Sequence, residues 1–263
     1  MADILAELRK IPPVTRFLVS SSLGVTLSAI MNLVSPYRLI FISQAVISKW
    51  EVWRLYTSLF LGSMNLNYIF EMVMLYRNSN TLESTHYERR SSDYAWQLFL
   101  ASLALIGINR PLQSYSHSRA LFHTLTYLMC SLSPPGALTS VMGLITIPVA
   151  YFPYALLGMD LLMGGKTAAA QGVSGMLVGH AWWWLIWGSG IGTGGVEQGI
   201  YAGWGRAPAW LKSWFGEREE HGRAGSRRGG VQAFAPRQRA EEAAASGRVT
   251  GHSWGSGTRL GDS

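Results

Sequence analysis

The stretch Ala120–Met159, ALFHTLTYLMCSLSPPGALTSVMGLITIPVAYFPYALLGM, decides the fold class, because none of its residues is Asp, Glu, Lys or Arg. A helix needs about 20 mainly apolar residues to cross the hydrocarbon of a bilayer, so this run is long enough for two crossings. Ser133–Gly136 interrupts it, since proline removes a helix donor and glycine favours turns. The run therefore predicts two membrane helices, one ending near Leu132 and one from about Leu138 to Leu162.

Further apolar segments lie on both sides of this run. They are Val14–Val34, about Leu55–Tyr76, about Tyr94–Ile108, and Ala168 to about Trp187. Pro12 and Pro13 suit the start of the first helix, because proline lacks only an N–H that is unpaired there. Pro148 and Pro153 are expected to kink the fifth helix. We therefore expect an all-α membrane protein, a bundle of six transmembrane helices.

Charge is distributed unevenly. Only 14% of all residues are charged, yet the part from Gly205 to Ser263 is rich in Arg, Gly and Glu. Arg residues also lie before the first helix and between the second and third, and the positive-inside rule places these segments in the cytosol with both termini. We expect a membrane domain over residues 1–190 and a separate motif at 251–263. Between them, residues 191–250 predict a flexible basic cytosolic tail, because they bury too little apolar area to offset their ordering entropy.

The segment Gly172–Gly175 has the form G-x-S-G, the pattern of the serine nucleophile in intramembrane proteases, and His180 follows. A nucleophile and its base need to lie within hydrogen-bond reach. Six helical residues point the side chains of Ser174 and His180 about 120° apart, with an offset of about 9 Å along the axis. These two residues therefore do not form a dyad on one helix. An active intramembrane protease stays an alternative that requires a Ser–His pair on different helices.

The same helix carries a stripe of small residues. Ala168, Gly172, Gly175 and Gly179 recur at spacings of four, three and four, which places them on one face. Small residues let helix backbones approach closely in lipid. The stripe predicts a helix-packing face with Gly175-x-x-x-Gly179 at its centre.

Glu71 and Asp160 are ionisable residues within the predicted helices. Such residues usually face a bundle interior or a water-filled cavity, and the other interpretation is that each lies near an interface and is solvated. A small-molecule transporter that uses them is a second alternative, although the internal repeat common in transporters is not visible. His123 and His180 are interpreted as packing histidines.

Metals, cofactors and nucleic acids are not expected as ligands. The sequence contains no Cys/His cluster with metal-ligand spacing and no phosphate loop or nucleotide fingerprint. Cys130 is the single cysteine, so an intrachain disulfide is excluded. We also expect no cleavable signal peptide, because polar, aromatic-rich sequence without a small-residue cleavage site follows the first apolar stretch.

The tail ends in WGSGTRLG at Trp254–Gly261, which has the format of a short linear motif. An extended peptide can pair its backbone with a sheet edge while apolar side chains fill pockets, and glycine permits the close approach. The residues concerned are Trp254, Gly255, Gly257, Arg259, Leu260 and Gly261. The other interpretation is an accidental Gly-rich terminus.

Several stretches, in the same order, resemble the Derlin family, rhomboid-like pseudoproteases of the endoplasmic reticulum. They are Ile11–Arg16, Leu33–Pro36, Val52–Thr57 with Trp53 and Arg54, Phe60–Gly62, Leu75–Arg77, Leu82–Glu83, Asp93–Tyr94, Tyr151–Gly158, and Gly175-x-x-x-Gly179-His180. The tail tip is similar to the SHP box, which binds the valosin-containing AAA+ ATPase. The resemblance covers residues 11 to about 187 and the last dozen.

The resemblance implies a rhomboid-like bundle in the membrane of the endoplasmic reticulum that is not an enzyme. The family's histidine position falls on Gly172, and no G-x-S-G lies near the start of the fourth helix. It also implies roles for single residues. Trp53 and Arg54 would anchor the lumenal loop, Gly175 and Gly179 would pack the sixth helix, and His180 would form a hydrogen bond nearby.

The implied function is a part in endoplasmic-reticulum-associated degradation. The protein would bind misfolded lumenal or membrane proteins and aid their retrotranslocation to the cytosol. The ATPase recruited by the tail would extract them for proteasomal degradation. A membrane ubiquitin ligase complex is a further implied partner, and a homo-oligomer is left open. A third alternative is a membrane scaffold without a translocation role, in which deletion of the tail alone reproduces the whole loss of function.

This sequence departs from the family pattern in several places. Asp160 stands where an uncharged residue is usual, and the loop Asn109–Ser118 is more polar than expected. The tail between Gly190 and Val249 matches only loosely.

Overall fold

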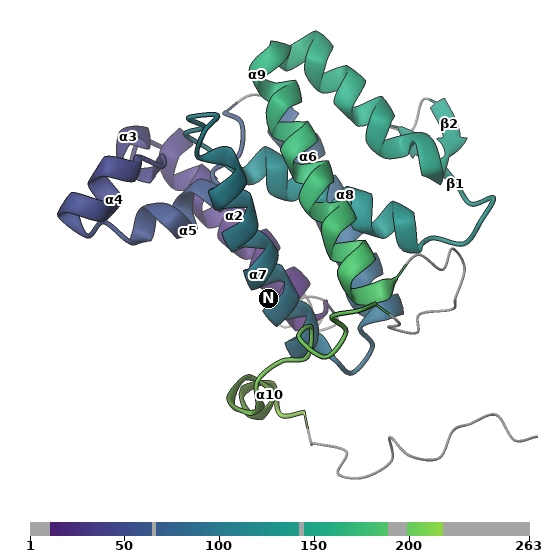
Figure 1. Ribbon diagram of the computed structural model, residues 1–263. Coiled ribbons are helices and arrows are strands. Elements are labelled where there is room, and N and C mark those ends of the chain that lie inside the picture. Colours follow the sequence, from purple (N-terminus) through teal and green to yellow (C-terminus); the bar gives the residue numbers. More distant parts are fainter. Residues whose placement is uncertain (1–10, 65–66, 142–144, 189–198, 218–263) are drawn as a thin grey trace, which may run out of the picture. The chain divides into compact units, whose positions relative to one another are not determined.

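The computed structural model describes residues 11–64, 67–141, 145–188 and 199–217 (Figure 1). The longer helices are α2 (Pro13–Ile30), α6 (Asn67–Thr81), α7 (Ser91–Asn109), α8 (Ser118–Leu132) and α9 (Phe152–Trp182). The shorter ones are α3 (Pro36–Leu39), α4 (Ser43–Lys49), α5 (Trp53–Phe60) and α10 (Ala209–Phe215). Turns of π-helix, η1 (Leu82–His86) and η3 (Trp183–Trp187), extend α6 and α9, and a 3-10 turn, η2 (Val149–Tyr151), precedes α9. The expectation of a mainly helical protein is confirmed.

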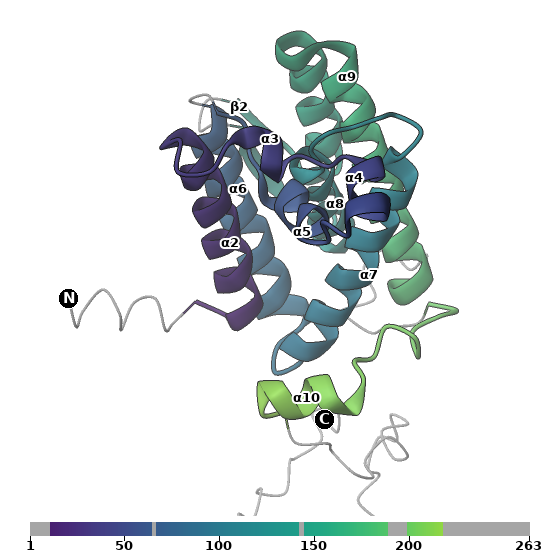
Figure 2. The ribbon, with the colours of Figure 1, turned by 90° about the vertical axis from the view of Figure 1, so that its left-hand side faces the viewer.

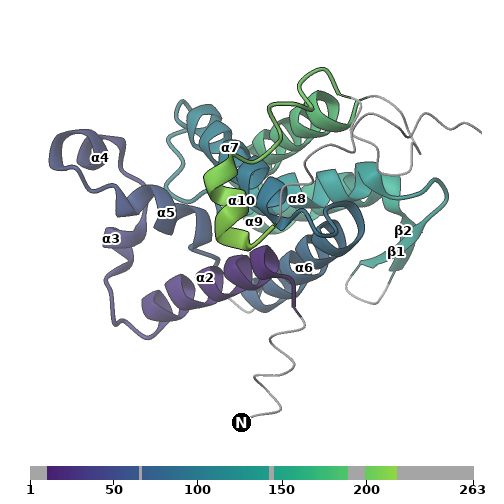
Figure 3. The same ribbon diagram turned by 90° about the horizontal axis from the view of Figure 1, so that it is seen from below.

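Helix α8 forms the centre of the bundle, because it contacts α5, α6, α7 and α9. Figure 3 shows α8 lengthwise, alongside α6. Its leucines Leu121, Leu125 and Leu128 are buried at helical spacing. The buried hydroxyls of Thr124 and Thr126 donate to the carbonyl oxygens of the residues four positions earlier, so burial leaves neither unsatisfied.

Only α2 among the described helices is long and apolar enough to cross a membrane by length and composition, with a mean hydropathy of 1.2 over 18 residues. The predicted number of six transmembrane helices is therefore not confirmed. Helices α6 and α8 have 15 residues each, fewer than the usual 20. Helix α6 begins at Asn67, because the first residues of the predicted second span belong to α5.

The prediction of a helix from Leu138 is wrong. Strands β1 (Leu138–Val141) and β2 (Ile145–Pro148) occupy this segment, antiparallel, with Leu138 opposite Pro148. Most residues between the two ends are Thr, Val and Ile, whose branched side chains favour strands. Arg77 at the end of α6 donates from Nη2 to Thr139 Oγ1 at 2.9 Å and so holds the hairpin to the bundle.

The predicted fifth and sixth helices are joined in α9, which changes direction at Gly165. This residue has φ 71° and ψ −168°, a conformation that glycine adopts without steric cost. Figure 1 shows the ribbon of α9 turning back there. The expected kinks at Pro148 and Pro153 are wrong, because Pro148 ends β2 and Pro153 lies in the first turn of α9, where proline is tolerated.

Residues 199–217 return to the bundle. The N–H groups of Gly199 and Tyr201 donate to the carbonyl oxygens of Ile186 and Leu185, at 2.9 and 3.0 Å. Helix α10 then packs on α7, as the view in Figure 2 shows. This segment lies within the range for which the sequence predicts a flexible tail, and in the structure it is folded.

Candidate functional site

Ser174 and His180 have separate partners. The Ser174 hydroxyl is buried and donates to Asn109 Oδ1 of α7 at 2.8 Å. His180 Nδ1 pairs with the hydroxyl of Tyr127 of α8 at 2.8 Å. The two side chains therefore face different helices, as their helical spacing predicts, and neither bond places a base beside the serine.

The glycine stripe of α9 lies against α8. A Cβ atom on Gly175 would overlap the carbonyl oxygen of Ala120, and one on Gly179 would lie 2.9 Å from the carbonyl oxygen of Thr124. The hydroxyl of Thr124 also donates to the carbonyl oxygen of Gly175 at 2.8 Å. The backbones of the two helices thus approach as closely as glycine permits, and an interhelical hydrogen bond holds them there.

Arg54 organises the loop between α2 and α6. Its side chain is buried, and Nη1 donates to the carbonyl oxygens of Tyr37 and Ile40 at 2.7 and 2.9 Å. Its Nε donates to the Glu51 carboxylate. One guanidinium therefore ties α5 to α3 by its fork of donors, which lysine does not offer. The neighbouring Trp53 points outward, with 55% of its surface exposed.

An ionic cluster of Glu71, Arg119, His123 and Asp160 joins α6, α8 and α9. Arg119 forms an ion pair with Asp160 through Nη1, and its Nη2 lies 3.6 Å from Glu71 Oε1. His123 Nε2 lies 2.6 Å from the other carboxylate oxygen of Asp160. The His123 side chain is almost fully buried, and the other three are 16–21% exposed.

This cluster brings together the two acidic residues that stand out in the predicted helices, and it adds two partners that the sequence did not indicate. Arg119 lies at the edge of the uncharged run, and His123 looked like a packing residue. Sequence spacing gives no sign of either contact, because the partners are 37–48 residues apart. The residues that the structure describes contain no group of His, Cys, Asp and Glu fit to hold a metal ion.

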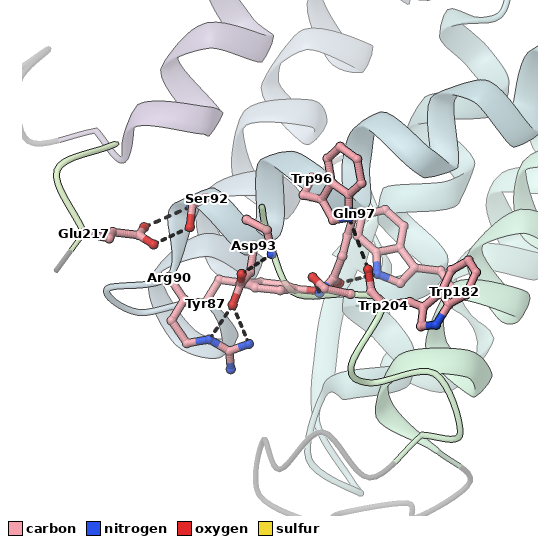
Figure 4. A network of polar contacts seen from close by, with 11 residues as sticks. Tyr87, Arg90, Ser92, Asp93, Trp96, Gln97, Trp182, Trp204 and Glu217 are labelled. Carbon is pink, nitrogen blue, oxygen red and sulfur yellow. Dashed lines mark hydrogen bonds and ion pairs between the residues drawn. The ribbon is translucent and has the colours of Figure 1, made fainter. Parts of the chain in front are cut away.

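A second polar network fixes residues 199–217 to the start of α7 (Figure 4). Asp93 accepts a hydrogen bond from the backbone N–H of Ala207 at 2.7 Å, and also binds Arg90. Gln97 donates from Nε2 to the carbonyl oxygen of Gly205 at 2.9 Å and accepts from Trp182 Nε1 at 2.8 Å.

The same network continues at both ends. Trp96 Nε1 donates to the carbonyl oxygen of Trp204 at 3.1 Å, and the N–H of Ser92 donates to Glu217 Oε1 at 2.9 Å. The side chains on α7 that receive the returning segment are mostly buried, so their bonds are costly to lose. Sequence patterns did not indicate this contact.

His117 lies in the connection between α7 and α8. Its Nδ1 is 3.2 Å from Ser58 Oγ, and the ring of Phe41 packs edge-on against it. Burial lowers the pKa of the His117 imidazole to about 4, because the charged form loses its hydration there. This histidine is therefore neutral at physiological pH.

The predicted tail motif Trp254–Gly261 lies outside the described residues.

Comparison with known proteins gives a consistent result. The model of the Der1-like family matches residues 11–198. The chain is similar to Derlin-2.1 of Zea mays, with 32% identity over 188 residues, which are 67% of this chain and 75% of that protein. It is 31% identical to Derlin-2.1 of Arabidopsis thaliana over 189 residues, 67% and 76% of the two chains. Derlin-1 of Arabidopsis thaliana is 29% identical over 182 residues, 66% of each chain.

Proposed function

The chain belongs to the Der1-like family, and on that premise we propose that it acts in endoplasmic-reticulum-associated degradation. It binds misfolded lumenal or membrane proteins within the endoplasmic reticulum membrane and aids their passage to the cytosol. The observation that carries this proposal is the family match over residues 11–198, which includes the motifs around Trp53, Arg54 and the glycine stripe.

The ionic cluster supports a role in handling polar chain. Moving a polar segment through lipid leaves its hydrogen-bonding groups unsatisfied, and each such group costs several kcal/mol. Glu71, Arg119 and Asp160 provide charged groups inside an apolar bundle, each still partly exposed. These groups offer hydrogen-bond partners to a client chain that crosses the membrane, and lipid offers none.

The proposal assigns no protease activity to the chain. Ser174 and His180 bind Asn109 and Tyr127, on different helices. A serine that donates to an amide oxygen lacks the general base that activates a nucleophile. The chain then works by binding its clients, and the force for extraction comes from a partner.

That partner is the valosin-containing AAA+ ATPase, bound by Trp254, Gly255, Gly257, Arg259, Leu260 and Gly261. Tethering the motif to the membrane domain raises its local concentration, so a weak peptide contact is sufficient. A membrane ubiquitin ligase complex would supply ubiquitylated clients.

The test compares two matched double variants of the tail in cells that lack the native chain. Trp254→Ala with Leu260→Ala removes the apolar anchors, and Arg237→Ala with Val249→Ala changes the tail outside the motif. We expect only the first to lose co-purification of the ATPase and to lengthen the half-life of a misfolded lumenal client. ATPase binding by both variants would remove the tail from the proposal.

A variant of the membrane domain separates translocation from scaffolding. Arg54→Ala should slow client clearance while the ATPase still co-purifies, because the substitution frees the loop and leaves the tail intact. The matched control is Arg38→Ala, an exposed arginine of the same loop. If deletion of the tail alone reproduces the whole loss and Arg54→Ala has no effect, the chain is a scaffold.

A further inference from the structure

An apolar groove of about 750 Å³ lies between α2, α5, α7 and α10, a volume typical of ligand-binding sites. Apart from Ser102, the residues that line it are aliphatic or aromatic. The Ser102 hydroxyl donates to the carbonyl oxygen of Leu98 at 2.8 Å, so its hydrogen is already used. The groove therefore offers a ligand apolar surface and almost no hydrogen bonds.

The length of the groove matches half a bilayer. On α7 it extends from Ala95 to Ile106, which is about 16 Å along a helix axis. The hydrocarbon core of a membrane is about 30 Å thick, so one leaflet contributes about 15 Å. Residues of α5 and α10 also line the groove. Helix α10 packs on α7 (Figure 2).

A client helix is at least 10 Å wide with its side chains, and it has no phosphate for the charge of Lys212 on α10. An extended peptide is narrower, but it carries backbone N–H and C=O groups that require partners in an apolar site. An acyl chain is narrow and apolar, and it has no polar group to satisfy. We infer that the groove binds one acyl chain of a membrane phospholipid, an inference that rests on the membrane location proposed above.

Helix α10 is suited to the headgroup end of this site. Its residues Leu211, Trp214 and Phe215 line the groove, and Trp210 and Trp214 are largely exposed, 63% and 80%. Tryptophan is enriched at the level of lipid headgroups. Lys212 on the same helix provides a positive charge for a phosphate. The residues of α10 follow those that the family model matches, so this closure is not part of the shared region.

The polar network on α7 holds α10 in place beside the groove. Asp93, Gln97 and Ser92 bind the segment on both sides of α10, at Ala207, Gly205 and Glu217. These contacts satisfy buried polar groups on α7 and fix α10 over the groove. A flexible tail would provide no such closure.

The test uses the full-length protein in lipid nanodiscs that contain a phosphatidylcholine with a photoactivatable diazirine in one acyl chain. Cross-linked peptides are mapped by mass spectrometry. We compare Ser102→Trp, which fills the groove, with Ala104→Trp, which adds the same ring two residues further along α7 in the neighbouring groove. Labelling of groove peptides should fall at least about tenfold in Ser102→Trp alone, a change of about 1.4 kcal/mol.

Leu103→Trp serves as a second variant in the same groove, since Leu103 is half exposed and its replacement leaves the core intact. Equal labelling of all lipid-facing helices, or no loss in either groove variant, overturns the inference. Displacement of the lipid label by a client transmembrane peptide also overturns it. The readout does not involve degradation. A failure of client clearance with groove labelling retained therefore counts against the proposed function, and the reverse result counts against the lipid site.

Discussion

The Glu83 carboxylate closes the first turn of α2 from a position 68 residues later in the chain. Its Oε2 accepts hydrogen bonds from the backbone N–H of Thr15 at 2.7 Å and from the Thr15 hydroxyl at 2.8 Å, and Oε1 accepts from the N–H of Val14 at 3.1 Å. The first N–H groups of a helix have no partner within the helix, and the helix dipole favours a negative charge there. Glu83 thus caps α2 in place of a local side chain, since α2 has no side-chain cap of its own.

Replacement of Glu83 should destabilise the protein. Glu83→Ala leaves two backbone donors and one hydroxyl buried without this acceptor, and we expect a loss of about 2–3 kcal/mol in the free energy of unfolding. The measurement is unfolding in mixed detergent micelles, followed by helical circular dichroism. Glu88→Ala is the matched control, because Glu88 is an exposed residue five positions later. Equal stability of the two variants contradicts the capping role.

Two glycines of α9 should respond oppositely to alanine. In Gly175→Ala the new methyl meets the Ala120 carbonyl oxygen, so we expect a loss of about 1–3 kcal/mol from overpacking. In Gly158→Ala nothing lies within 4 Å, and the higher helix propensity of alanine should leave stability equal or raise it by up to about 1 kcal/mol. The measurement is the thermal unfolding of both variants in detergent, compared with that of the parent protein. A stable Gly175→Ala protein would show that α8 and α9 can separate at no cost.

The ionic cluster should behave as a unit. Asp160→Asn leaves Arg119 with Glu71 at 3.6 Å as its remaining acidic partner, and we expect a loss of about 2 kcal/mol, reduced from a fully buried pair by partial exposure. The double variant Arg119→Met with Asp160→Met should lose less unfolding free energy than the sum of the losses in the two single variants. A double-mutant cycle in micelles measures this coupling. If Asp160→Asn keeps full stability but abolishes a proton-coupled uptake, the transporter alternative gains support.

His117 should make stability depend on pH. Its pKa is about 4 in the folded protein and about 6.5 when unfolded, so between these values only the unfolded state binds the proton. Stability is therefore full above about pH 6.5 and falls as the pH drops towards 4, by up to about 3 kcal/mol. His117→Asn should flatten the profile over this window relative to the parent protein. Parallel profiles for the two proteins would contradict the assignment.

The sequence predicted local features better than distant contacts. Pro13 starts α2, and α8 ends at Leu132 just before the proline pair, because both signals act on their own segment. The offset between Ser174 and His180 also followed from helix geometry alone. The strand pair at Leu138–Pro148 was missed, since a short apolar run does not distinguish a strand from a helix.

The contacts that shape the site were not predictable in this way. Arg119 binds Asp160 and Asp93 binds Ala207 across 41 and 114 residues, and no spacing rule connects such positions. A break between Leu162 and Ala168 was expected, and Gly165 at positive φ provides it, but the kinks expected at Pro148 and Pro153 are absent. Long-range pairing therefore accounts for most of what the sequence did not show.

The attachment of residues 199–217 defines where a truncated protein can end. A chain that stops at residue 198 keeps all that the family model matches, yet it strips Asp93, Gln97 and Ser92 of the backbone and carboxylate partners that they hold in the full protein. Each buried polar group left without a partner costs about 1–3 kcal/mol. We therefore expect a stable truncated protein to need the chain up to residue 217, nineteen positions past the end of the family match.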